Sequence, residues 1–238
     1  MDENNENQNS NITKDEIKKE ASETLSEVKK SIKDTNLKKD ANEAKNFLVN
    51  FFKSPFTEMK KVTINAKSFL KIAIILLVVW VVAELIGSII SIVKSSAYSY
   101  YSSLGMYFRN SMEDLLQVLG TIIVPVIIVA LLSGILYLLM KNKKKDFLTI
   151  LTTVMIAEIP LVIASVLSLF SYIGSEIAII IRAIQTLCYF LNAVLLYFAI
   201  KHLCEEEDDN KVMRTFLITM SIFYGISIIL NFLHIYIY

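Results

Sequence analysis

The chain has 238 residues, of which 54% are hydrophobic, and a formal net charge of +1. Its mean hydropathy of +0.52 is too high for an ordinary soluble domain and is typical of a protein with several membrane spans. The near-neutral charge excludes a protein that binds nucleic acid through general basicity, so no nucleic-acid partner is expected.

The N-terminal region divides into a tail and an arm. Residues 1–13 are polar and are predicted to be a disordered tail without a signal peptide. Thr13 and Glu16 have the spacing of a capping box, and an apolar stripe at helical spacing follows. Residues 14–53 are therefore predicted to form a cytoplasmic amphipathic helical arm. A solvated helix, a weak coiled coil and a membrane-surface helix all fit its thin stripe, which consists of Ile17, Ala21, Leu25, Val28 and Ile32.

The second part of the arm, residues 41–53, ends in an aromatic cluster that includes Phe47, Phe51 and Phe52. Aromatic side chains next to lysines suit the headgroup region of a membrane. We therefore expect this cluster to grip the inner leaflet and its lysines to attract anionic lipid headgroups. Ser54 and Pro55 then mark the start of a new helix, as N-cap and first helical residue.

Residues 54–238 are predicted to be an all-α, polytopic transmembrane domain. The stretch 177–203 is 27 residues long, and at about 1.5 Å per residue it crosses a hydrocarbon core of roughly 30 Å. The connection at residues 174–176 is short, which predicts an antiparallel hairpin of the third and fourth spans. Residues 94–114 are expected to be a loop. The five predicted spans are residues 69–93, 115–140, 148–172, 177–203 and 216–238.

Positive charge predicts the orientation of these spans. Eleven lysine and arginine residues flank them on one side, whereas only Lys94 and Arg109 lie on the other. Cytoplasmic loops carry the excess of Lys and Arg, so we expect a multi-pass protein of the cell membrane with its N-terminus in the cytoplasm and its C-terminus outside.

Polar residues inside the spans fall into two layers. Arg182, Gln185, Tyr189 and Asn192 share one helix face, and such a face must be covered by other spans because unpaired polar groups are expensive in lipid. Counting residues from the outer end of each span puts Glu158 and Asn192 near the middle of the membrane as a candidate polar pair. The same count gives an outer-half layer that contains Glu84, Arg182, Gln185, Asn231 and His234.

The outer-half layer has three interpretations, of which two are the main ones. In one it is a polar pocket with an ion pair between Glu84 and Arg182, able to hold a polar headgroup or to relay protons. In the other, these groups pair with one another only to fix the register of the helices. In a third, Arg182 extends to the membrane surface without a partner.

No motif of soluble enzyme chemistry is present. The sequence lacks HExxH, GxGxxG, GxxxxGK[ST], CxxC and GxSxG. Two histidines and two cysteines do not make a convincing metal site. We therefore expect no catalytic residue, no metal and no cofactor, and a protein that is not an enzyme.

Three segments resemble the Yip family, named for Ypt-interacting proteins, and its bacterial-type members in particular. They are SPFTEMKKV before the first span, DFLTILTTVMIAEIPLVI at the third, and LLYFAIKHL before the last loop. The resemblance covers residues 47–238 and implies five spans with a cytoplasmic N-terminal region. Eukaryotic members of that family act in Golgi and vesicle traffic with small GTPases, and the family has no catalytic residue to transfer to this chain.

The leading functional prediction is a non-enzymatic membrane organiser or scaffold. It would act through the lipid bilayer, through anionic headgroups at the arm, or through a protein partner on the cytoplasmic side. The alternative is a small transporter, or a transporter subunit, that uses the outer-half pocket. An intramembrane enzyme is a weaker third hypothesis, because no nucleophile accompanies the acidic residues Glu84 and Glu158.

Overall fold

The computed structural model describes residues 14–33, 37–98, 104–140, 145–204 and 208–232. Every regular element in these ranges is helical, which confirms the all-α class. Thr13 and the predicted tail lie outside the described residues. The elements are α1 (Lys14–Lys33), α2 (Leu37–Lys53), α3 (Pro55–Ile64), α4 (Ala66–Tyr98), α5 (Leu104–Leu139), α6 (Phe147–Ala157), α7 (Ile159–Ser168), η2 (Leu169–Tyr172), α8 (Ser175–Leu203) and α9 (Asp209–Phe232).

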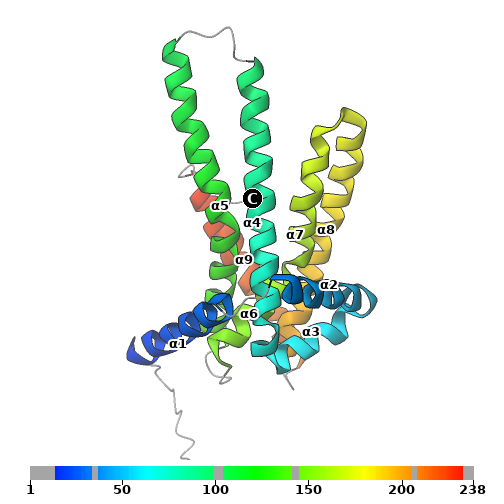
Figure 1. Cartoon of the computed structure of the whole chain (residues 1–238). Coiled ribbons are helices and arrows are strands. Elements are labelled where there is room, and N and C mark those ends of the chain that lie inside the picture. The colour runs from blue at the N-terminus through cyan, green and yellow to red at the C-terminus, as the bar shows by residue number, and fades with distance from the viewer. Residues whose placement is uncertain (1–13, 34–36, 99–103, 141–144, 205–207, 233–238) are drawn as a thin grey trace, which may run out of the picture.

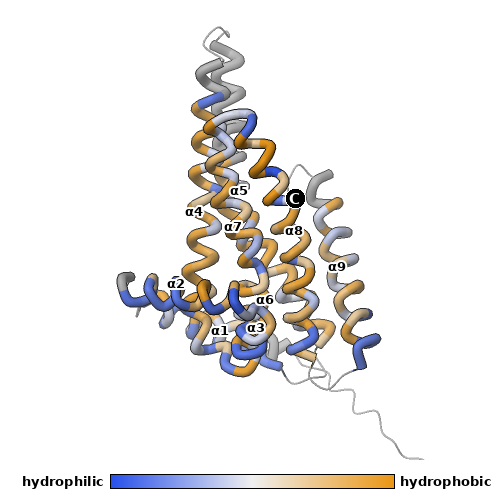
Figure 2. The backbone as a smooth tube through the Cα atoms, turned by 90° about the vertical axis from the view of Figure 1, so that its right-hand side faces the viewer, coloured by the Kyte–Doolittle hydropathy of each residue, from blue (hydrophilic) through white to orange (hydrophobic). Residues whose placement is uncertain are grey.

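The described part of the chain contains helices that are long and apolar enough to cross a membrane. Four single helices, α4, α5, α8 and α9, meet this condition, and α6 with α7 and η2 forms a fifth, bent candidate. The chain is thus a multi-pass membrane protein. Figure 1 shows these helices running in one general direction, with α1, α2 and α3 gathered at one end. In Figure 2 hydrophobic residues dominate the long helices, and hydrophilic residues collect at the end that carries α1–α3.

The third span is broken at Glu158. Helix α6 ends at Ala157, helix α7 begins at Ile159, and the two axes differ by 41°. Pro160 explains the break, because it has no N–H group with which to bond the carbonyl oxygen of Ile156. The sequence prediction of one continuous span over residues 148–172 missed this bend.

The predicted loop over residues 94–114 is shorter in the structure. Helix α4 continues to Tyr98 and helix α5 begins at Leu104. Neither proline nor glycine occurs between Val93 and Tyr98, so nothing in the sequence stops α4 where its strongly apolar stretch ends. The prediction from polar composition therefore ended this helix too early.

The core lies where α4, α5, α6 and α8 meet, in the part of the bundle nearer to α1–α3. Every α6 residue from Thr152 onward is buried, and α6 contacts α3, α4, α5 and α8. Large side chains fill the surrounding space, among them Trp80, Leu136, Ile156 and Leu196. The bent third span is thus the most enclosed element, and its neighbours are built around it.

Helix α2 divides its aromatic residues between the protein and the outside. Phe47 and Phe51 are buried, and the Phe47 ring lies 5.4 Å from that of Phe69 in α4. Phe52, the next residue after Phe51, is 60% exposed. The expectation that the whole cluster grips lipid is therefore wrong for Phe47 and Phe51. They face inward because α2 packs against α3 and α4.

Helix α1 packs through its polar side. Thr24 is buried, whereas Leu25 and Ile32 of the predicted apolar stripe are 54% and 57% exposed. The described contacts of α1 are to the first residues of α4 and α6 and to Tyr137 of α5. The apolar stripe is thus not what attaches α1 to the bundle.

We expect the two neighbouring phenylalanines of α2 to differ sharply when mutated. Phe51→Ala removes a ring from the core and should lower the free energy of unfolding by about 3 kcal/mol. Phe52→Ala removes an exposed ring and serves as the matched control, with little loss of stability. Thermal unfolding of the two variants in lipid nanodiscs measures the difference, and equal melting temperatures would contradict the placement of α2.

Candidate functional site

The polar side chains of the spans converge on α7. Ser165 of α7 donates its hydroxyl hydrogen to Glu84 Oε1 of α4, with 2.5 Å between the oxygens. On the neighbouring residue, the Ala164 carbonyl accepts a hydrogen bond from Gln185 Nε2 of α8 at 3.2 Å. Two predicted pocket residues from different spans therefore bond to adjacent residues of a third span.

The other members of the predicted outer-half pocket are not brought together in the described structure. Arg182 is exposed and forms no ion pair with Glu84. The side chain of Asn231, in α9, and the whole of His234 lie outside the described residues. A pocket between the first, fourth and fifth spans stays a prediction, and the Glu84 contact that the structure records leads to α7 instead.

Glu158 and Asn192, which the sequence predicts to lie near the middle of the membrane, are in contact. Asn192 Nδ2 donates a hydrogen bond to Glu158 Oε2 at 2.7 Å, and it lies 3.5 Å from the carbonyl oxygen of Ala157. Both side chains are buried, and only 1% of Glu158 is exposed. This contact fastens α8 to the break between α6 and α7.

The break frees backbone acceptors that Asn192 partly satisfies. The N–H of Leu161 bonds to the carbonyl of Glu158, so it does not serve the carbonyl of Ala157 as it would in a continuous helix. The Asn192 amide lies where it replaces this donor. An unpaired carbonyl group costs free energy in a membrane span. The amide of Asn192 therefore compensates for the break in the third span.

The end of the third span that lies away from α1–α3 is held by contacts that the sequence pattern does not reveal. The Tyr172 hydroxyl donates to the carbonyl of Gly87 at 3.0 Å. Lys94 Nζ donates to the carbonyl of Tyr172 at 2.9 Å and lies 4.8 Å from the centre of its ring. The span-end position of Tyr172 and the positive charge of Lys94 were visible in the sequence, but their pairing across two spans was not.

At the end of the bundle that carries α1–α3, lysines of α4 contact acidic residues of the arm. Lys67 Nζ lies 3.8 Å from Glu27 Oε1 of α1. Lys71 Nζ lies 3.5 Å from Oδ1 of the buried Asp40 in α2. The Tyr137 hydroxyl of α5 donates to Glu20. Lys67 is one of the eleven positive residues that predict the orientation, and helical spacing alone does not reveal these acidic partners on the arm.

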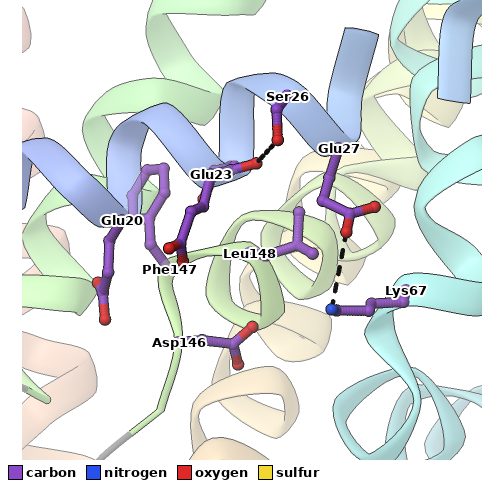
Figure 3. Close-up of a pocket in the computed structure, with 9 residues that line it drawn as sticks. Glu20, Glu23, Ser26, Glu27, Lys67, Asp146, Phe147 and Leu148 are labelled. Atoms are coloured by element: carbon purple, nitrogen blue, oxygen red, sulfur yellow. Dashed lines mark hydrogen bonds and ion pairs between the residues drawn. The ribbon is translucent and has the colours of Figure 1, made fainter. Parts of the chain in front are cut away.

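A cavity of about 240 Å³ lies between α1 and the first residues of α4 and α6. Figure 3 shows Glu20, Glu23 and Glu27 of α1 on one side and Asp146 with Leu148 on the other, and the dashed line joins Glu27 to Lys67. Within the described part of the chain these carboxylates do not form a group suited to hold a metal ion. The cavity marks a loosely packed contact between α1 and the bundle.

We expect Asn192→Leu to destabilise the protein although the two side chains are similar in size. The change leaves Glu158 Oε2 and the Ala157 carbonyl without their buried donor, which should cost about 1–3 kcal/mol. Thr186→Val is the control on the same helix, because the exposed Thr186 bonds only to its own helix. Thermal unfolding in nanodiscs measures both, and an unchanged melting temperature for Asn192→Leu would show that the contact contributes nothing.

Comparison with curated proteins gives no match, and comparison with solved structures gives none either. A family model described as the Yip1 domain matches residues 49–230, which cover α3 to nearly all of α9. This match extends over well more than half of the sequence and includes all five candidate spans. The chain therefore belongs to the Yip1 domain family.

Proposed function

We propose that this member of the Yip1 domain family is a non-enzymatic membrane organiser of the cell membrane. Residues 54–238 act as its five-span domain, with the N-terminus in the cytoplasm and the C-terminus outside. Residues 14–53 act as an arm that lies along the inner leaflet and contacts anionic lipid headgroups. The observation that carries the proposal is the exposed apolar flank of each arm helix.

Helix α1 has the geometry of a helix that lies between a protein and a lipid surface. Leu25 follows the buried Thr24 directly, and Ile32 lies eight residues after Thr24. At 3.6 residues per turn both are about a quarter of a turn around the helix from the protein-facing side. Apolar side chains on that flank suit insertion at the boundary between headgroups and acyl chains.

Helix α2 repeats this arrangement. Phe52 is about a quarter of a turn from the buried Phe51, and Val49 on the same flank is 46% exposed. Figures 1 and 2 share a vertical axis, and both place α2 nearer than α3 to the outer end of the long helices. The exposed flank of α2 is thus close to the level at which the spans enter the membrane.

Lysines border these apolar flanks. Lys18 and Lys29 of α1 and Lys45 of α2 are exposed, and each lies next to the apolar flank on the helical wheel. Lysine stems pack on apolar surface while the ammonium group reaches phosphate, so this order suits an anionic leaflet.

The described polar contacts of the spans support an organiser rather than a transporter. Glu84, Gln185 and Asn192 each bond to a residue of the bent third span or its break. Side chains used in this way fix the helices against one another. No observation within the described residues favours a substrate path.

The test places a fluorophore on single introduced cysteines of the full chain in nanodiscs that contain anionic lipid and a lipid-attached quencher. The two native cysteines are buried. Labels at Leu25→Cys and Phe52→Cys should be strongly quenched, because these positions lie on the apolar flanks. Labels at Lys30→Cys and Asn50→Cys, exposed positions on the far sides of the two helices from Leu25 and Phe52, are the matched controls and should be weakly quenched.

Lipid composition and a topology probe complete the experiment. Replacing anionic by zwitterionic lipid should reduce quenching at both flank positions, since the lysines lose their partners. Equal quenching at flank and control positions contradicts the lipid-facing arm. An impermeant reagent that labels Lys30→Cys from outside intact cells contradicts the cytoplasmic N-terminus.

A further inference from the structure

The buried carboxyl group of Glu158 has a use that goes beyond the arm and the organiser role. It lies eleven residues from the start of α6, and Asn192 lies eleven residues from the end of α8. At about 1.5 Å per residue both are roughly 16 Å from the inner end of their spans, close to the middle of the membrane. This depth is far from either aqueous surface.

The two oxygens of this carboxyl group have different surroundings. Oε2 accepts the hydrogen bond from Asn192, whereas Oε1 is buried without a hydrogen-bond partner among the described residues. The neighbouring residues Ala157, Ile159 and Pro160 are buried and offer no side-chain donor. An ionised carboxylate in such a place lacks the donors and the counter-charge that it needs.

The charged groups on neighbouring elements are engaged elsewhere. On α4, Glu84 bonds to Ser165, which is seven residues along α7 from Glu158. On α3, Lys61 pairs with Glu58 at 2.6 Å. On α8, the uncharged Cys188 lies one turn from Asn192, and Arg182 is exposed. The other ionisable groups on α3, α4, η2 and α8 lie away from Glu158 along the sequence of their helices. Toward the end that carries α1–α3 they are Lys60, Lys67, Lys71, Lys201 and His202; toward the opposite end they are Lys94, Tyr172 and Glu176; and Tyr189 and Tyr197 lie three and five residues from Asn192 on α8.

From this placement we infer that Glu158 is an intramembrane proton-binding site that controls the bend between α6 and α7. With the proton bound, the neutral carboxyl group stays in the apolar centre and accepts the Asn192 hydrogen bond, which ties α8 to the break. When the proton leaves, the carboxylate draws water or another donor to Oε1. The Asn192 hydrogen bond to Oε2 then becomes stronger, because a carboxylate is the better acceptor, and the Glu158 side chain shifts toward the new donor at Oε1, which changes the angle between α6 and α7.

The break makes this control possible. A carboxyl group on a continuous helix has no backbone joint to move, whereas here Glu158 is the residue that joins two helices. Its own carbonyl accepts from Leu161 and Val162 at the start of α7. Movement of the Glu158 side chain is therefore coupled directly to the first turn of α7.

The first measurement is infrared spectroscopy of the full chain in nanodiscs at neutral pH. A protonated carboxyl group gives a C=O stretching band above the amide I band. The wild type should show this band, and Glu158→Gln should lose it. Glu84→Gln changes the other described carboxylate deep in the spans and should keep it. Absence of the band from the wild type, or its loss in Glu84→Gln alone, overturns the inference.

Asn192→Leu gives a second readout that does not depend on removing the acid. It should shift the band to higher frequency, because the carboxyl group loses its hydrogen bond from Asn192. An unshifted band would mean that the observed acid is not Glu158.

Stability as a function of pH tests whether the folded protein holds the proton. A glutamate that unfolding exposes loses its proton near a pH of about 4.3, so a folded form that holds the proton at neutral pH binds one proton more than the unfolded form. The melting temperature of the wild type should therefore fall by several degrees, relative to Glu158→Gln, as the pH rises from about 6 to about 9. Parallel curves overturn the inference. Selective stabilisation of the wild type by Na⁺ over K⁺ at high pH also overturns it, in favour of a bound metal cation.

Discussion

The need to pair every polar group in hydrocarbon governs this structure, and it acts most strongly at the break after Ala157. Pro160 removes one backbone donor, and the Leu161 N–H turns to Glu158 instead of Ala157. Asn192 from α8 approaches the acceptors that result. The proline therefore causes the bend, the bend frees a carbonyl group, and the amide group of Asn192 from the next span approaches it.

The same rule explains why α7 lies between two spans. Glu84 of α4 and Gln185 of α8 bond to adjacent residues on α7, Ser165 and Ala164. Neither polar side chain has to face lipid. Tyr172 and the exposed Lys94 add further contacts at the end of the span that lies away from α1–α3. A bent helix held at three levels has a defined angle despite its proline.

Helical spacing, length and hydropathy were enough to predict the all-α multi-span fold and the start of α3 at Pro55 after Ser54. They also suggested Glu158 and Asn192 as a polar pair, and these two side chains are in contact. They did not identify the partners that other side chains find in three dimensions. Periodicity could not tell that Phe51 is buried while Phe52 is exposed, because both lie on one broad apolar arc. Depth alone paired Glu84 with Arg182, whereas the structure records a hydrogen bond to Glu84 from Ser165 of α7. Three-dimensional neighbours, rather than spacing, choose between such alternatives.

The arm and the break are joined by one short helix. Helix α6 meets α1 near Leu148, beside the cavity, and ends at Ala157 next to Glu158. It is buried along most of its length and packs against α3, α4, α5 and α8. The contacts of α1 at this end are exposed or half-buried ion pairs and a hydrogen bond, which are individually weak. A change in angle at the break, as inferred for Glu158, would therefore be passed by α6 to a weakly attached helix. Like α2, this helix carries exposed apolar side chains, which the proposed function places against lipid.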